Sequence, residues 1–237
     1  MFDFQRATSV VLILLTCILF PLPVFSDQAA NDASQTSSSS QKLLVLGDSL
    51  SAAYGLKANQ GWVSLLQKRW QDEQLPIDVV NAAISGDTTD GGLARLPRLL
   101  KQHNPTHVLI ELGGNDGLQG HPVGKLKQNL MKMITLIEGH GAVPLLQDMQ
   151  IPTNYGRRYT EMFGESFDDV ADKRNITLVP FFLKDIALDP SLMQRDGIHP
   201  NAEAQPKIRD YMYRQLTPLL LPQDAMVLPL PEINIAI

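Results

Sequence analysis

Apolar and polar positions follow two different rhythms along this chain from residue 42 onward. Short, nearly continuous apolar runs are typical of strands that are covered on both faces. Five such runs occur, at 42–46, 77–84, 107–112, 142–149 and 176–181. Between and after them, apolar residues recur every three or four positions, which predicts amphipathic helices. The helical segments are 61–71, 88–103, 123–141, 155–174 and 201–216.

This order of elements predicts the fold class. Strands that alternate with helices form βαβ units with right-handed crossovers, which place a parallel sheet between two layers of helices. In such α/β folds, ligands bind outside the carboxyl ends of the strands. The residues that follow each predicted strand are therefore the first place to look for chemistry.

The N-terminal segment has a different character. Residues 1–26 are typical of a secretory signal peptide, because Arg6 precedes an apolar run at 10–25 and the small residue Ser26 marks a cleavage point. Asp3 offsets the charge of Arg6, so an uncleaved anchor is the alternative. Export of this kind predicts a periplasmic or secreted protein.

Three further segments complete the predicted organisation. The Ser-rich stretch 27–41 is too poor in apolar residues to pack, which predicts a solvated linker. Residues 42–220 are the folded domain, and 221–237 are an apolar, Pro-rich tail. The only cysteine, Cys17, lies in the leader, so we expect no disulfide and no thiolate nucleophile in the mature chain.

Composition narrows the choice of partners. The 237 residues are 44% apolar and 19% charged, as in a packed globular domain, and the formal net charge is −5. This charge argues against nucleic acid as a partner, and we expect no stable membrane span once the leader is cleaved. No His, Asp and Glu cluster has metal-ligand spacing and no Gly-rich loop could cradle a phosphate, so we expect no metal and no other cofactor. A monomer acting on small molecules is the resulting hypothesis.

Polar clusters bounded by glycine follow the predicted strands. Ser49 in "GDSLS" follows the first strand, Gly86 in "ISGD" the second, and Asn115 in "GGND" the third. Asp196 and His199 lie in "RDGIHPN", in the long loop after the fifth strand. Taken singly, each cluster is typical of a turn or a helix cap. Their joint occurrence at strand ends favours an active site.

The residue types suit nucleophilic catalysis. A serine hydroxyl needs a base to remove its proton, and His199 can do this for Ser49. Asp196, three positions before His199, can bind the other ring nitrogen and fix the tautomer. We expect Gly47 to let the backbone turn Ser49 toward these partners.

Acyl transfer also creates an oxyanion, which needs donors aimed at one point. The backbone N–H groups of Ser49 and Gly86 and the side-chain amide of Asn115 are the candidate donors. Gly86 offers its amide with no side chain in the way. The chain has no G-x-S-x-G sequence, which argues against an ordinary α/β-hydrolase elbow.

Together, "GDSL", "ISGD", "GGND" and "DGIHP" resemble the motifs of the SGNH (GDSL-type) hydrolases. The resemblance covers most of 42–220 and is greatest to the bacterial periplasmic members that hydrolyse acyl-CoA thioesters, aryl esters and lysophospholipids. It implies a three-layer α/β/α sandwich with a flavodoxin-like, five-stranded parallel sheet. It implies the same triad, Ser49, Asp196 and His199.

The resemblance also implies substrate contacts. The loop 117–124 corresponds to one that responds to acyl chains in the family, and here it contains His121 followed by Pro122. The candidate substrate-binding residues are Asp48, Leu50, Gly117, Leu118, His121, Ile151 and Pro152. A carbohydrate deacetylase of the same family is the alternative activity, and a non-catalytic exported binding domain is the alternative outside enzymes.

Overall fold

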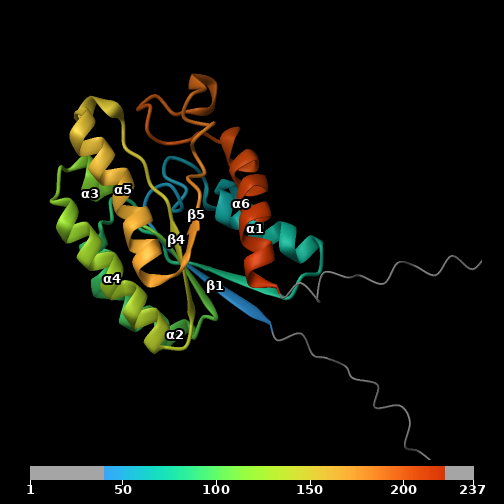
Figure 1. Ribbon diagram of the computed structural model, residues 1–237. Helices are drawn as coiled ribbons and strands as arrows, with labels where there is room; N and C mark the ends of the chain where they lie inside the picture. The colour runs from blue at the N-terminus through green and yellow to red at the C-terminus, as the bar shows by residue number, and fades with distance from the viewer. Residues whose placement is uncertain (1–39, 222–237) are drawn as a thin grey trace, which may run out of the picture. The chain divides into compact units, whose positions relative to one another are not determined.

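The computed structural model describes residues 40–221, which form a parallel sheet covered by helices (Figure 1). The predicted signal peptide, nearly all of the predicted linker and the tail from residue 222 lie outside the described residues. Within residues 40–221, no helix is long and apolar enough to cross a membrane.

The sheet has five strands, in the order β2-β1-β3-β4-β5, and every neighbouring pair is parallel. This is the flavodoxin-like order, in which the chain switches direction across the sheet between β1 and β3. The fold-class prediction is therefore confirmed. The strands are β1 (Gln41–Gly47), β2 (Ile77–Asn81), β3 (His107–Glu111), β4 (Val143–Gln147) and β5 (Thr177–Val179).

The helices form two layers on the faces of this sheet (Figure 1). One layer contains α1 (Trp62–Asp72) and α6 (Ala204–Leu220). The other contains α2 (Thr89–His103), α4 (Val123–Gly139) and α5 (Arg157–Arg174). The shorter elements are α3 (Gly114–Leu118) and the 3-10 turns η1 (Ala58–Gln60), η2 (Thr153–Tyr155) and η3 (Pro190–Leu192).

The continuous apolar run in β1 supplies both layers because side chains alternate across a strand. Leu44 and Leu46 pack in the cluster under α2, α4 and α5, whereas Leu43 and Val45 pack under α1 and α6. All four are fully buried. The strand that precedes Ser49 is thus fixed from two sides.

The strands β2 and β5 are shorter than predicted, and two helical elements also differ from the sequence prediction. The short helix α3 lies in "GGNDGL", where three glycines and an Asx pair hide any helical periodicity. Helix α6 continues past Pro218 to Leu220, although the prediction ended it at residue 216. The reason is packing, because Leu216 and Leu220 are buried in the core beneath α1 and α6.

A buried hydrogen bond joins the two helices of the first layer. Trp70 in α1 donates its indole N–H to the Thr217 hydroxyl in α6 at 2.9 Å. Trp70 is fully buried and Thr217 is 4% exposed, so no solvent can replace the acceptor. The hydroxyl therefore satisfies a polar atom that the core would otherwise leave unpaired.

Replacing Thr217 with valine should destabilise the protein by about 1–3 kcal/mol, because the shape is kept and the indole N–H loses its acceptor. Urea unfolding of the wild type and the variant measures the difference. Thr217→Ser is the matched control, since it keeps the hydroxyl. Equal stability of the valine and serine variants would contradict this role.

Candidate active site

A groove with a volume of about 370 Å³ lies at the carboxyl ends of the strands. Its wall includes Ser49, Asn115 and His199, which come from three separate connections. The remaining lining residues are mostly apolar and are Asp48, Leu50, Gly114, Leu118, Met149, Gln150, Ile151, Pro152, Phe181, Leu183, Ala187, Met193, Gly197 and Ile198. The site thus combines convergent polar groups with an apolar trough, as ligand sites commonly do.

Three predicted residues lie in one hydrogen-bonded row. His199 Nε2 is 2.8 Å from Ser49 Oγ, although 150 positions separate the two residues. His199 Nδ1 is 2.8 Å from Asp196 Oδ2. With Nδ1 protonated toward the carboxylate, Nε2 is left free to accept the serine proton.

The loop that carries His199 is held in place from several sides. Met193 and Pro200 form an isolated antiparallel bridge, and the Gln194 amide donates to the Tyr54 carbonyl at 2.8 Å. The Tyr54 ring also contacts the His199 ring, with centroids 4.3 Å apart. The base is therefore positioned by the segment that follows the nucleophile as well as by its own loop.

Asp196 is a stabilised carboxylate. Partial burial opposes its ionisation, but the backbone N–H groups of His199 and Ile198 donate to Oδ1 at 3.0 and 2.9 Å. These bonds, with the His199 ring, lower the pKa of Asp196 to about 2. Asp196 is thus ionised at any pH at which the protein would work.

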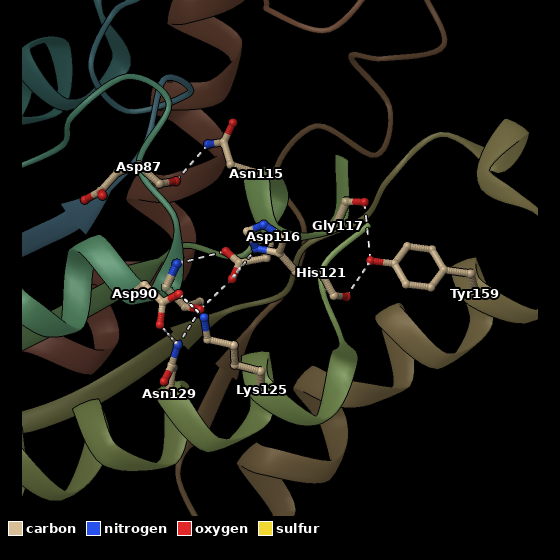
Figure 2. Close-up of polar contacts among 10 residues, drawn as sticks. Asp87, Asp90, Asn115, Asp116, Gly117, His121, Lys125, Asn129 and Tyr159 are labelled. Carbon is tan, nitrogen blue, oxygen red and sulfur yellow. Dashed lines mark hydrogen bonds and ion pairs between the residues drawn. The ribbon is translucent and has the colours of Figure 1, made fainter. Parts of the chain in front are cut away.

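Two of the three candidate oxyanion donors are unpaired. Among residues 40–221, no group accepts the backbone N–H of Ser49 or of Gly86. Gly86 has a φ of +80°, a left-handed conformation that glycine adopts without strain. Asn115 differs, because its Nδ2 already donates to the Asp87 carbonyl at 2.9 Å and to Asp48 Oδ2 at 3.1 Å. Figure 2 shows the contact with Asp87.

Arg95 of α2 holds the segment that contains Gly86. Its guanidinium pairs with Asp87 Oδ2 at 2.8 Å and also donates to the backbone carbonyls of Ala82 and Gly47. Both side chains of the ion pair are largely buried, at 14% and 12% exposed. One cation therefore ties the end of β1, the end of β2 and the candidate oxyanion segment together. Sequence reasoning missed this residue, which looks like an ordinary surface position of a helix.

A second buried group anchors the loop after Asn115 (Figure 2). Asp116 is 2% exposed and accepts the Thr89 backbone N–H at 2.8 Å and the Thr89 hydroxyl at 2.6 Å. It thereby caps the N-terminus of α2, where Thr88 has no capping bond of its own. Tyr159 donates its hydroxyl to the His121 carbonyl at 3.0 Å. The loop is thus attached to both α2 and α5.

The predicted substrate contacts fall into two groups. Asp48, Leu50, Leu118, Ile151 and Pro152 line the groove, whereas Gly117 and His121 do not. Gly117 is buried where a Cβ would lie 2.7 Å from atoms of Ile151 and Phe163, so it permits packing behind the groove. The His121 ring lies beside Asp116, with Nδ1 3.8 Å from Oδ1. Sequence reasoning missed Met149 and Gln150 in the groove, although their place two and three positions after the end of β4 could have indicated them.

The space beneath the nucleophile holds a pair of buried carboxyl groups. Glu111, the last residue of β3, is fully buried, and Asp48 is 2% exposed. Gly47 has no positive φ; it must be glycine because a Cβ there would lie 2.5 Å from Glu111 Oε2. The expected turn of the backbone toward the partners of Ser49 therefore does not use a left-handed conformation at Gly47. Its role is to make room for Glu111.

Burial sets the protonation of this pair. Desolvation raises the pKa of Asp48 to about 6 and raises the pKa of Glu111 well above its usual range, and the proximity of Asp48 raises the pKa of Glu111 further.

Within the described residues, no three His, Cys, Asp or Glu side chains are grouped so that they could hold a metal ion.

The fold and the hydrogen-bonded row of Ser49, His199 and Asp196 are those of a class of hydrolytic enzymes built on a parallel sheet. Comparison with known proteins agrees: residues 45–205 match the GDSL-like Lipase/Acylhydrolase family. The chain belongs to this family, whose members are ester hydrolases.

Relatives and solved structures support the assignment. The chain is 49% identical to "Thioesterase 1/protease 1/lysophospholipase L1" of Escherichia coli, over 75% of this chain and 84% of that protein. It is 52% identical to "Esterase TesA" of Pseudomonas aeruginosa, over 76% and 90% of the two chains. The solved structure of the esterase EstA from Pseudoalteromonas sp. matches with a TM-score of 0.73 and 49% identity, over 74% of this chain and 96% of that one.

Asp48→Asn should change how stability depends on pH. The pKa of Asp48 rises from its ordinary 3.8 to about 6 on folding, so the folded chain binds more protons between these values. The contribution of Asp48 to stability is therefore present below pH 4 and is lost as the pH rises through 6. This loss is on the order of 3 kcal/mol.

Chemical unfolding at pH 4 and pH 7 measures the effect. The variant should gain stability relative to the wild type between the two pH values. Asp78→Asn, at an exposed position of β2, is the control and should show no such change. A wild-type-minus-variant difference that is the same at both pH values would rule out a raised pKa for Asp48.

Proposed function

We propose that this protein is an exported serine esterase and thioesterase that works through a covalent acyl-enzyme. The observation that carries the proposal is the row of hydrogen bonds from Asp196 through His199 to Ser49, with 2.8 Å at each side-chain contact. Its position at the mouth of an apolar groove supports an acyl substrate.

In the first half of the reaction, His199 Nε2 takes the proton of Ser49 as Oγ attacks the carbonyl carbon of the substrate. Asp196 stabilises the resulting imidazolium through Nδ1. Collapse of the tetrahedral intermediate breaks the bond to the alcohol or thiol, which leaves with the proton from His199 where it needs one. The acyl group is then esterified to Ser49.

The oxyanion of that intermediate is held by preorganised donors. The N–H groups of Ser49 and Gly86 have no other acceptor among residues 40–221 and therefore need no rearrangement. Asn115 joins them by sharing an amide hydrogen that Asp48 or Asp87 accepts in the free protein. In the second half, water replaces the alcohol, His199 removes its proton, and the acid is released.

The lining of the groove points to the substrate class. Side chains such as Leu118, Met149 and Phe181 would bury methylene groups and offer few partners to the hydroxyl groups of a sugar. This favours acyl esters and thioesters, including aryl esters, acyl-CoA and lysophospholipids, over an acetylated carbohydrate. The names of the relatives, thioesterase, lysophospholipase and arylesterase, support the same choice.

The remaining parts of the proposal concern the setting of the enzyme. The apolar run after Arg6 supports export to the periplasm or beyond, and the net charge of −5 supports action on small molecules rather than on nucleic acid. We propose that the domain acts as a monomer without a cofactor, since the triad and the oxyanion donors all come from one chain.

Ser49→Ala should abolish hydrolysis of a short p-nitrophenyl ester while the fold persists, because no other group in the row is a nucleophile. Absorbance assays give the rate, and far-UV circular dichroism checks the fold. Ser64→Ala is the matched control, because the Ser64 hydroxyl, in the first turn of α1, donates to the Ala58 carbonyl of η1, away from the groove. A fluorophosphonate probe should label the wild type at Ser49, as the solved EstA structure "inhibited by monoethylphosphonate" suggests. Activity retained in Ser49→Ala would refute the mechanism.

The dependence of the rate on acyl chain length should distinguish the esterase from the carbohydrate deacetylase. Each methylene buried in the groove contributes about 0.8 kcal/mol, so kcat/KM should rise up to about fourfold per methylene until the groove is filled. A series of p-nitrophenyl esters from acetate to dodecanoate, with an acetylated sugar alongside, measures this. A deacetylase would instead prefer the acetylated sugar, and its rate would fall as the acyl chain grows.

A further inference from the structure

The pairing of β1 with β3 places two acidic residues against each other below Ser49. Gly47 and Glu111 are partners in the register, so Asp48 follows directly beside the end of β3. Glu111 Oε2 accepts the Ser51 hydroxyl at 2.5 Å and the Asp48 backbone N–H at 3.3 Å. Glu111 thus contacts the residues on both sides of the nucleophile.

The two acidic residues also affect each other. Asp48 donates its backbone N–H to Glu111 Oε2, and a charge on Asp48 raises the pKa of Glu111. Glu111 Oε1 has no N–H or O–H donor among the described residues. Two adjacent carboxylates this deeply buried cannot both ionise. Because no donor stabilises a charge at Glu111 Oε1, the arrangement favours the proton on Glu111.

Asp48 has partners suited to an anion. Leu50 donates its backbone N–H to Oδ1 at 3.0 Å, and Asn115 donates its side-chain amide to Oδ2 at 3.1 Å. The charged and titratable groups that face the pair are His199 from the loop before α6, which favours the ionised form, and Asp87 from the loop before α2, which opposes it. Arg95 of α2 lies nearby, on the Gly47 carbonyl.

We propose that Asp48 and Glu111 are a positioning unit for hydrolysis: Glu111 keeps a proton and donates it to an ionised Asp48, whose Oδ2 holds the Asn115 amide beside Ser49. This inference rests on the proposed function. Asp48 does not itself contact the reacting atoms. It acts by positioning the side chain of Asn115. The charge-assisted bond fixes Nδ2 more firmly than a neutral acceptor would.

The arrangement explains why two acids persist in the core. An ionised Asp48 beside a second ionised carboxylate would repel it and displace the backbone on which Ser49 lies. A protonated Glu111 removes that repulsion and supplies a donor at the same time. Ser51 and the Asp48 N–H then keep the Glu111 side chain in place over Gly47.

A double-mutant cycle tests the action of Asp48 through Asn115. Asn115→Ala should lower kcat about 100-fold to 1000-fold, as loss of an oxyanion donor does. Asp48→Asn should lower kcat about 10-fold to 100-fold in the wild type, with little change in KM, but less than about threefold in the Asn115→Ala background. Equal losses in both backgrounds would overturn the proposal, as would a faster Asp48→Asn enzyme.

The Glu111→Gln variant tests the proton. Its amide can donate to Asp48 and its carbonyl can accept from Ser51, so kcat at neutral pH should stay within about threefold of the wild type. Infrared spectra at the same pH should show the carbonyl stretch of a protonated carboxylic acid in the wild type and not in the variant. A wild type without that band, or a variant as slow as Asn115→Ala, would overturn the assignment.

The outcome for this unit is separable from the outcome for the proposed function. If Ser49→Ala retains activity, the serine mechanism fails and the positioning unit fails with it. If Ser49→Ala is inactive and the probe labels Ser49, but the cycle is additive, only the positioning unit is wrong. Probe labelling of Asp48→Asn at Ser49 confirms that this variant is folded and still holds its nucleophile.

Discussion

The parallel pairing of β1 with β3 is the constraint on which the rest of the site depends. It sets Gly47 opposite Glu111, and Ser49 and Asn115 then follow a few residues beyond the two strand ends. Because both strands are buried on their two faces, a shift in the register of either strand would expose its apolar side chains. Ser49 and Asn115 are thus fixed by two neighbouring, buried strands of the sheet.

The base reaches this centre by a different route. His199 lies on a loop beyond β5, at the far edge of the sheet. The bridge between Met193 and Pro200 and the contact of the His199 ring with Tyr54 hold it at Ser49. Its partner Asp196 lies on the same loop, so that the carboxylate and the imidazole move together. The site therefore joins a rigid half, built on central strands, to a half carried by one loop.

Much of this arrangement could be predicted from the sequence because its physical basis is local. Apolar runs such as 107–112 predict buried strands, and parallel strands bring their carboxyl ends to one edge, which places Ser49 near Asn115. The alternation does not encode contacts between side chains of distant segments. Glu111 therefore looked like the polar end of a strand, and Arg95 looked like a solvated helix residue.

Helix α3 and the loop after it show the same limit. Glycines and an Asx pair predict a turn there, whereas the structure has a short helix in which Asp116 accepts the backbone N–H of Thr89 from a distant segment. His121 is a candidate substrate contact because it lies in the loop after Asn115. The structure places its ring beside Asp116, and its backbone carbonyl accepts from Tyr159, contacts that the sequence does not encode.

The buried acid pair has a consequence for the evolution of the protein. Folding opposes a charge at Asp48, whereas the proposed chemistry needs one, so the two requirements favour different residues at one position. Selection for thermal tolerance alone would favour a neutral side chain there. A lineage that keeps the acid therefore records continued selection for turnover, and a thermostable descendant that has lost it should be a slower enzyme.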